Sequence, residues 1–246
     1  MKLSALAKKA AKGPVAAAYG GAMNVEDMIR FVLFHGTKGA DEIERLLKQH
    51  QWVMDGQLPD GSLVVPFGRW AVACIAYGRE GVAGLALMLR EQAMAHFAVG
   101  ILREVRTPAA VDALLDYCAA ARFMANDREH PAWGEWQALA ALNQLLALDD
   151  FVPVSERTLD RLRETAIRAY ECGVTAHLKR TALFALRGAP NAAALDWAER
   201  LTVLDSEVES ARSVCVRALR KRLAPDLKPL NAEQKRQVRR ARAANV

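Results

Sequence analysis

The chain has 246 residues, of which 52% are hydrophobic, 25% are charged and 7% are aromatic. This balance excludes a disordered chain, and the length suffices for one substantial domain or two small ones. Ala and Leu dominate the apolar residues, which favours helices because both lose little side-chain entropy on entering one. No apolar run reaches the roughly eighteen residues that a membrane-crossing helix needs. We therefore expect a helical protein of the cytoplasm.

The net charge of +6 is unevenly distributed along the chain. Residues 1–12 contain four lysines and no acid, and residues 216–246 contain ten basic and two acidic side chains. Residues 13–215 contain 20 basic and 26 acidic side chains. The high isoelectric point is therefore assigned to the two ends, and the body of the chain is mildly acidic.

Capping residues and Gly or Pro breaks divide the chain into short helices. Acidic residues after Asn24 favour a helix start there, His35-Gly36 and Gly78 are interpreted as helix ends, and Thr107-Pro108 as a cap followed by a first helical residue. The expected helices are 25–34, 40–50, 70–77, 81–91, 93–105, 109–122, 136–148, 156–171, 175–187, 191–203 and 206–222, with a weak basic helix near 231–244.

Residues 51–66 interrupt the helical pattern. Two apolar segments, residues 52–54 and 63–65, flank the sequence Pro59-Asp60-Gly61. Proline, aspartate and glycine in this order favour a tight turn, so this segment is predicted to be a small β-hairpin packed on the helices.

A short motif recurs along the chain. Ala98–Arg103, Ala182–Arg187 and Cys215–Arg220 each place Leu-Arg after small or apolar residues, and each is followed within five residues by a proline. The offsets of 84 and 33 residues are compatible with units of about 42 residues and one shorter unit.

Over roughly residues 68–225 this pattern resembles HEAT-like or armadillo-type helical repeats. The resemblance implies an all-α fold, a right-handed stack of antiparallel helix pairs with the hairpin inserted near its start. The alternative is a non-repetitive helical bundle, in which Ala, Leu and Arg recur because the chain is rich in them. The expected organisation is a basic N-terminal arm (1–21), a single helical-repeat domain (22–225) and a basic C-terminal helix or tail (226–246).

No catalytic motif is present in the sequence. There is no G-x-S-x-G elbow and no G-x-x-x-x-G-K-[ST] loop. The four cysteines, Cys74, Cys118, Cys172 and Cys215, form no C-x-x-C pair and are predicted to be buried thiols. We expect no cofactor and no metal site, and the sequence favours a non-enzymatic role while leaving enzymatic activity open.

The most polar and aromatic loop lies at residues 127–136. Metal binding by Asp127, Glu129 and His130 is disfavoured, because their spacing matches no helical ligand pair. Together with the hairpin, this loop is the expected partner-binding region, because loops on a rigid scaffold often carry function. The candidate residues are Trp52, Asp55, Asp60, Asp127, Glu129, His130, Trp133 and Glu135.

The acidic body indicates a basic protein partner, since complementary charge speeds encounter and excludes like-charged competitors. This predicts a non-catalytic, macromolecule-binding protein, such as a bacterial toxin-neutralising (immunity-type) or adaptor protein. The alternative is a DNA-binding or DNA-repair protein similar to HEAT-like alkylpurine glycosylases, which would use Trp133, Trp136 and the basic C-terminus. The residues of that C-terminus are Lys235, Arg236, Arg239, Arg240 and Arg242. The oligomeric state is left open.

Overall fold

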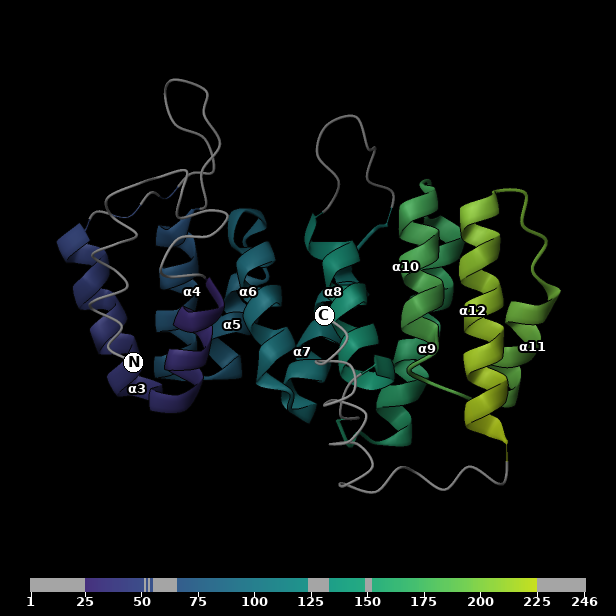
Figure 1. Ribbon diagram of the computed structural model, residues 1–246, viewed down its shortest axis with the longest axis horizontal. Helices are drawn as coiled ribbons and strands as arrows, with labels where there is room; N and C mark the ends of the chain where they lie inside the picture. Colours follow the sequence, from purple (N-terminus) through teal and green to yellow (C-terminus); the bar gives the residue numbers. More distant parts are fainter. Residues whose placement is uncertain are drawn as a thin grey trace, which may run out of the picture. The chain divides into compact units, whose positions relative to one another are not determined.

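The computed structural model describes residues 25–50, 52, 54, 66–123, 133–148 and 152–224. Within these residues the fold is all-helical, as predicted, and contains no strand (Figure 1). The helices are α3 (Val25–His50), α4 (Phe67–Glu80), α5 (Val82–Met88), α6 (Gln92–Val105), α7 (Pro108–Ala120), α8 (Trp133–Asn143), α9 (Glu156–Cys172), α10 (Ala176–Leu186), α11 (Ala192–Arg200) and α12 (Ser206–Leu223), and a π-helix, η2 (Gln144–Leu148), follows α8.

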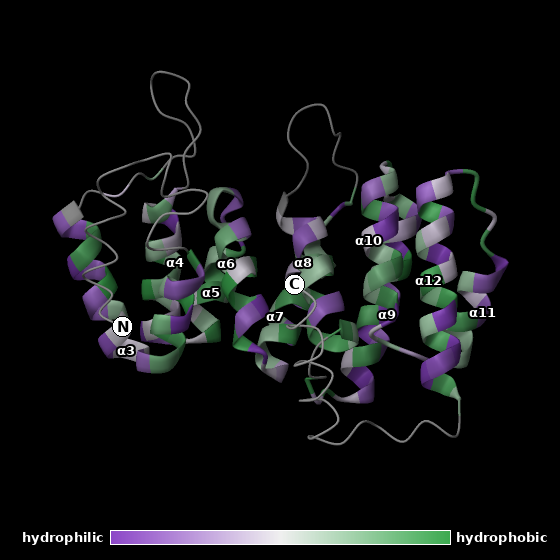
Figure 2. Cartoon of the chain, in the orientation of Figure 1, coloured by the Kyte–Doolittle hydropathy of each residue, from purple (hydrophilic) through white to green (hydrophobic). Residues whose placement is uncertain are grey.

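The chain divides into two compact units. Unit 1 consists of Met1–Ala121 and Ala132–Ala141, and unit 2 of Arg122–Pro131 and Leu142–Val246. In unit 1, α4 packs along α3, and α6 contacts α4, α5 and α7. In unit 2, α10 lies between α9 and α12, and α11 packs on α12 (Figure 1). Helices such as α3 and α12 alternate hydrophilic and hydrophobic residues, so that each buries one face (Figure 2).

Side-chain caps confirm two of the predicted helix starts, those of α7 and α10, whereas the predicted cap Asn24 lies outside the described residues. The hydroxyl of Thr107 accepts from the backbone N–H of Ala110 at 3.3 Å, and Pro108 is the first helical residue of α7. Thr175 caps α10 in the same way, with 3.1 Å between its hydroxyl and the amide nitrogen of Leu178. Such a cap contributes about 1 kcal/mol, because it satisfies a donor that has no partner inside the helix.

The two predicted glycine breaks have different outcomes. Gly36 adopts φ 55° and ψ −129° and divides α3 into two helical segments, as expected. Gly78 does not end a helix, because α4 continues to Glu80. A Cβ atom at position 78 would lie 2.7 Å from the Cβ of Ala40 and 2.8 Å from the carbonyl oxygen of Gly36. Gly78 therefore allows α3 and α4 to approach closely.

The structure corrects the predicted bounds of one helix and the predicted burial of one cysteine. The expected helix at 136–148 begins earlier, and its end is the π-helix η2. Cys74, Cys118 and Cys215 are buried, but Cys172 is exposed because it is the last residue of α9.

Several predicted segments lie outside the described residues. These are the arms 1–21 and 226–246, the basic helix near 231–244 and most of the hairpin at 51–66. The described members of that hairpin segment, Trp52, Met54 and Pro66, are not in a strand. The hairpin and the domain boundaries stay predictions.

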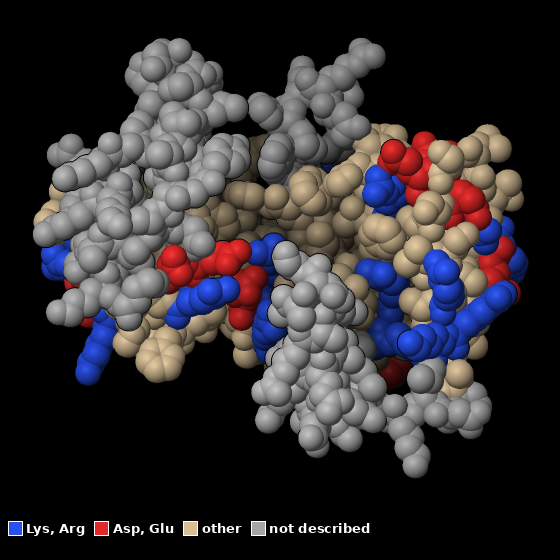
Figure 3. Space-filling view, viewed as in Figure 1, with Lys and Arg blue, Asp and Glu red and all other residues tan. Residues whose placement is uncertain are grey.

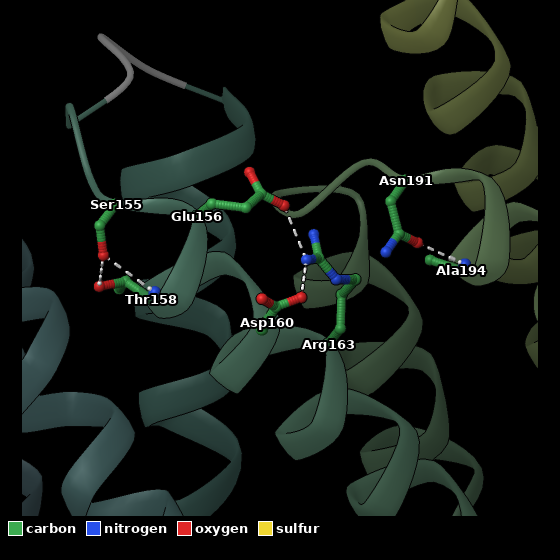
Figure 4. A network of polar contacts seen from close by, with 7 residues as sticks. All are labelled: Ser155, Glu156, Thr158, Asp160, Arg163, Asn191 and Ala194. Atoms are coloured by element: carbon green, nitrogen blue, oxygen red, sulfur yellow. Dashed lines mark hydrogen bonds and ion pairs between the residues drawn. The ribbon is translucent and has the colours of Figure 1, made fainter.

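One arginine side chain of unit 2 lies largely out of solvent. The side chain of Arg163 on α9 is 8% exposed, and its Nη2 donates to Glu156 at 2.8 Å and to the carboxylate of Asp160 (Figure 4). Its Nη1 is buried and has no hydrogen-bond partner among the described residues. The two carboxylates are 70% and 55% exposed, so most of the desolvation falls on the arginine.

Replacing Gly78 with alanine tests the close contact of α3 with α4. Helix propensity alone predicts a gain of about 1 kcal/mol in the free energy of unfolding. The contacts above predict the opposite, a loss of about 1–3 kcal/mol, because the backbone of α3 must move. Denaturant unfolding of the full chain distinguishes the two, and an unchanged or increased stability of Gly78→Ala would contradict the packing described here.

The contact of Arg163 with Glu156 and Asp160 predicts that removing the carboxylates costs more stability than removing the arginine. The double variant Glu156→Gln/Asp160→Asn leaves a buried charge uncompensated and is expected to lose about 3 kcal/mol. Arg163→Met keeps the apolar stem and leaves two carboxylates in water, so its loss is expected to be smaller. Glu164→Gln, an exposed acid on the same helix, is the control and should be neutral. Equal losses for Arg163→Met and the double variant, measured by denaturant unfolding, would overturn this explanation.

Candidate functional site

Three of the eight predicted partner-binding residues fall within the described residues. Trp52 lies in the core of unit 1, where its ring is 7% exposed and packs against Phe67 at 6.4 Å between ring centroids. Trp133 is the first residue of α8, and Glu135 follows in its first turn. The others, Asp55, Asp60, Asp127, Glu129 and His130, lie outside the described residues.

For the nucleic-acid alternative, Trp136 is a half-buried residue of α8. The C-terminal residues Lys235, Arg236, Arg239, Arg240 and Arg242 lie outside the described residues.

Glu135 opens onto a groove of about 770 Å³ in unit 1. The groove lies among α5, α7 and α8, with most of its lining on α7. Alanines form much of the wall of the groove and leave its volume open, and most of the other lining side chains are polar or aromatic. The lining residues are Ala86, Leu89, Arg90, Ala109, Asp112, Ala113, Asp116, Tyr117, Ala120, Ala121 and Glu135.

The sequence of α7 explains why this space exists. Asp112 and Asp116 are one helical turn apart and therefore share a face, and Ala109, Ala113 and Ala120 lie on or beside that face. Alanine has no side chain beyond Cβ, so the alanines form a shallow floor between the two acids. The opposite face of α7 is apolar and buried, which fixes how the helix is rotated.

A close contact between two helices completes the groove. Gly134 on α8 lies against Tyr117 on α7, and a Cβ at position 134 would be only 2.2 Å from the phenolic oxygen. The missing side chain lets the start of α8 approach the ring. Glu135, the next residue, is thereby brought to the same groove as Asp112 and Asp116.

Burial and charge act together on Tyr117. Burial of the ring raises the pKa of its hydroxyl to about 12, and the negative charge of Glu135 adds to this rise. The hydroxyl is therefore neutral at physiological pH and can donate or accept a hydrogen bond. Its aromatic ring also offers a face that attracts cations.

The groove has an excess of negative charge. Three carboxylates, from Asp112, Asp116 and Glu135, face one guanidinium, that of the exposed Arg90. A partly enclosed site strengthens electrostatic attraction because water screens the charges less. The arrangement therefore suits a cationic group, such as an ammonium or guanidinium, and not a phosphate. Among the described residues, no group of three or more His, Cys, Asp or Glu is placed to hold a metal ion.

The charge balance of unit 2 is the reverse. Its described residues contain 14 Lys and Arg against nine Asp and Glu, whereas those of unit 1 contain nine against eleven. Lys and Arg side chains gather over α10 and α12 (Figure 3). Arg217, Arg220 and Lys221 are exposed residues of α12. Part of the positive charge assigned to the C-terminal end thus lies on a helix of unit 2.

Comparisons of this chain with protein-family models, curated proteins and solved structures find no match. Among the described helices, none has both the length and the apolar character that crossing a membrane requires.

Sequence reasoning included Glu135 but missed Asp112, Asp116 and Tyr117. The available signal was an acidic pair four residues apart on an alanine-rich helix face. That pattern is typical of any solvated helix. It indicates a groove only once α5 and α8 are known to lie beside α7.

Replacing Gly134 with alanine tests how the groove is built. The new Cβ would displace the Tyr117 ring, and we expect a loss of about 1–3 kcal/mol in the free energy of unfolding. The double variant Gly134→Ala/Tyr117→Phe removes the phenolic oxygen and should recover part of that loss. Thermal or denaturant unfolding measures both, and independent, additive effects of the two substitutions would contradict the contact.

Proposed function

We propose that this is a non-catalytic, macromolecule-binding helical protein that engages a basic protein partner, and that the groove of unit 1 receives a Lys or Arg side chain of that partner. The observation that supports this most is the set of three carboxylates beside a neutral tyrosine in a groove of about 770 Å³. We also propose that the helix pairs form a right-handed, HEAT-like stack with a hairpin insertion, and that this stack is the scaffold for binding. An immunity-type or adaptor role fits such a scaffold.

The chemistry of the groove favours a side chain over a free ion. Carboxylates on two helices can accept hydrogen bonds from the several N–H groups of one guanidinium or ammonium, and the alanine floor gives its aliphatic stem an apolar contact. Hydrogen bonds to charged groups contribute about 1.5–3 kcal/mol each. One such anchor gives weak binding, so the partner must also contact surrounding surface.

A second candidate function rests on unit 2. Its excess of Lys and Arg, concentrated over α10 and α12, favours a polyanion such as nucleic acid (Figure 3). Such binding would be sequence-independent and strongly weakened by salt. We rank nucleic-acid binding second because two of these arginines already form ion pairs, Arg180 with Glu207 and Arg220 with Glu199.

The proposal is tested with a synthetic Lys/Arg-rich peptide and an acidic peptide of equal length. We expect the full chain to bind only the basic peptide at physiological ionic strength, and Asp112→Asn/Asp116→Asn to weaken it about tenfold because charge-assisted hydrogen bonds are lost. Glu80→Gln, an exposed acid of α4, is the control and should bind as the wild-type chain does. Calorimetry or fluorescence anisotropy measures the affinities.

Unchanged peptide affinity in the double variant would refute the groove as the binding site. The same assay tests the second function. Nucleic-acid binding would replace the proposal if the chain bound duplex DNA more strongly than the basic peptide at the same salt concentration. The triple variant Arg217→Gln/Arg220→Gln/Lys221→Gln should then lose the DNA binding.

A further inference from the structure

Two arginines of unit 2 come together where two helices end. Arg187 follows the last residue of α10, and Arg222 lies in the last turn of α12. A guanidinium nitrogen of Arg222, Nη1, donates a hydrogen bond to the backbone oxygen of Arg187. Both side chains are half-buried, and the positive charge of Arg187 acts unfavourably on that of Arg222 in a setting that water screens incompletely.

Among the described residues, the guanidinium of Arg187 donates hydrogen bonds only to neutral groups. Its Nε and Nη2 donate to the amide oxygen of Asn143, at 3.1 and 2.8 Å, and its Nε also contacts the backbone oxygen of Phe184 at 3.2 Å. The guanidinium lies over the Phe184 ring at 4.9 Å. No carboxylate among the described residues pairs with Arg187.

The thiol of Cys215 does not supply a negative charge to Arg187 either. Burial raises the pKa of Cys215 to about 12, so this residue is a neutral thiol at physiological pH. The two helix ends contribute only partial negative charge, about half a unit each. Burial accordingly lowers the pKa of both arginines, and for Arg222 the charge of Arg187 lowers it further.

Asn143 is the informative residue in this cluster. It stands where α8 gives way to the π-helix η2, and one oxygen of its side chain accepts both hydrogen bonds from Arg187. An aspartate of the same shape would accept the same bonds and neutralise the guanidinium. With an amide there, Arg187 is positioned but remains charged, and its hydrogen bonds to described residues use Nε and Nη2 but not Nη1. Short π-helical segments often occur at functional sites.

We propose that Arg187, Arg222 and Asn143 form a binding site for a small phosphate group, as inorganic phosphate or a phosphomonoester. A phosphate has three or more terminal oxygens, enough to accept hydrogen bonds from two guanidiniums at once, whereas a carboxylate is satisfied by one. Asn143 holds Arg187 in place, and the phosphate contacts the Nη1 edge of Arg187 and the guanidinium of Arg222. This site is separate from the acidic groove of unit 1, so it stands independently of the function proposed above.

The site is tested by calorimetry of the full chain with inorganic phosphate, methyl phosphate and acetate, at constant ionic strength set with chloride. We expect phosphate and methyl phosphate to bind and acetate to bind about tenfold more weakly or not at all. Tighter binding of methyl phosphate identifies an ester as the ligand, and tighter binding of inorganic phosphate identifies the free ion. Equal binding of acetate, or no binding of either phosphate, would overturn the proposal.

Three variants separate a ligand site from a purely structural cluster. Arg222→Gln should weaken phosphate binding about tenfold, while Arg157→Gln, at an exposed arginine of α9 in the same unit, should leave it within about twofold. Asn143→Asp should raise the melting temperature and weaken phosphate binding, because its carboxylate takes the place of the ligand's charge. This variant gains stability, so loss of binding cannot result from unfolding. Phosphate affinity that is unchanged in Asn143→Asp, or lost in Arg157→Gln as much as in Arg222→Gln, would refute the site.

Discussion

Glycine and alanine at helix contacts set how closely these helices can pack, and other features depend on that closeness. Gly78 lies against Ala40 in unit 1, and Gly188 lies against Leu146 in unit 2, where an added Cβ would be 2.9 Å from the neighbouring Cβ. Such contacts gain dispersion energy because backbones approach without a side chain between them. A larger side chain at these glycines would collide with the neighbouring helix. The glycines therefore restrict how the helices of each unit can pack.

The acidic groove follows from the same constraint. Because Gly134 has no side chain, the start of α8 can approach Tyr117, and Glu135 then shares a groove with the acids of α7. Unit 2 combines its own tight packing with an excess of positive charge, part of it partly buried at Arg187. The two units thus differ in surface charge, and we propose that one binds a cationic group and the other an anion. That difference is the main functional information in the structure.

The sequence predicted the helices well because their start signals are local. Thr107 and Thr175 cap helices through bonds to residues three positions ahead, and Gly36 breaks α3 through its own backbone conformation. Gly78 was misinterpreted because its role depends on α3, which is distant in the sequence. The groove was missed for the same reason: Asp112 and Asp116 resemble an ordinary solvated face until α5 and α8 are placed beside them.

The central claim, that the groove of unit 1 receives a basic side chain, is tested most directly by mapping where a Lys/Arg-rich peptide binds. Backbone amide chemical shifts of the isotope-labelled full chain would be followed during titration with the peptide. The account predicts that the largest changes occur at Asp112, Asp116, Tyr117 and Glu135, with little change along α9 to α12. Changes that centre on unit 2, or that spread evenly over exposed acids of both units, would contradict it.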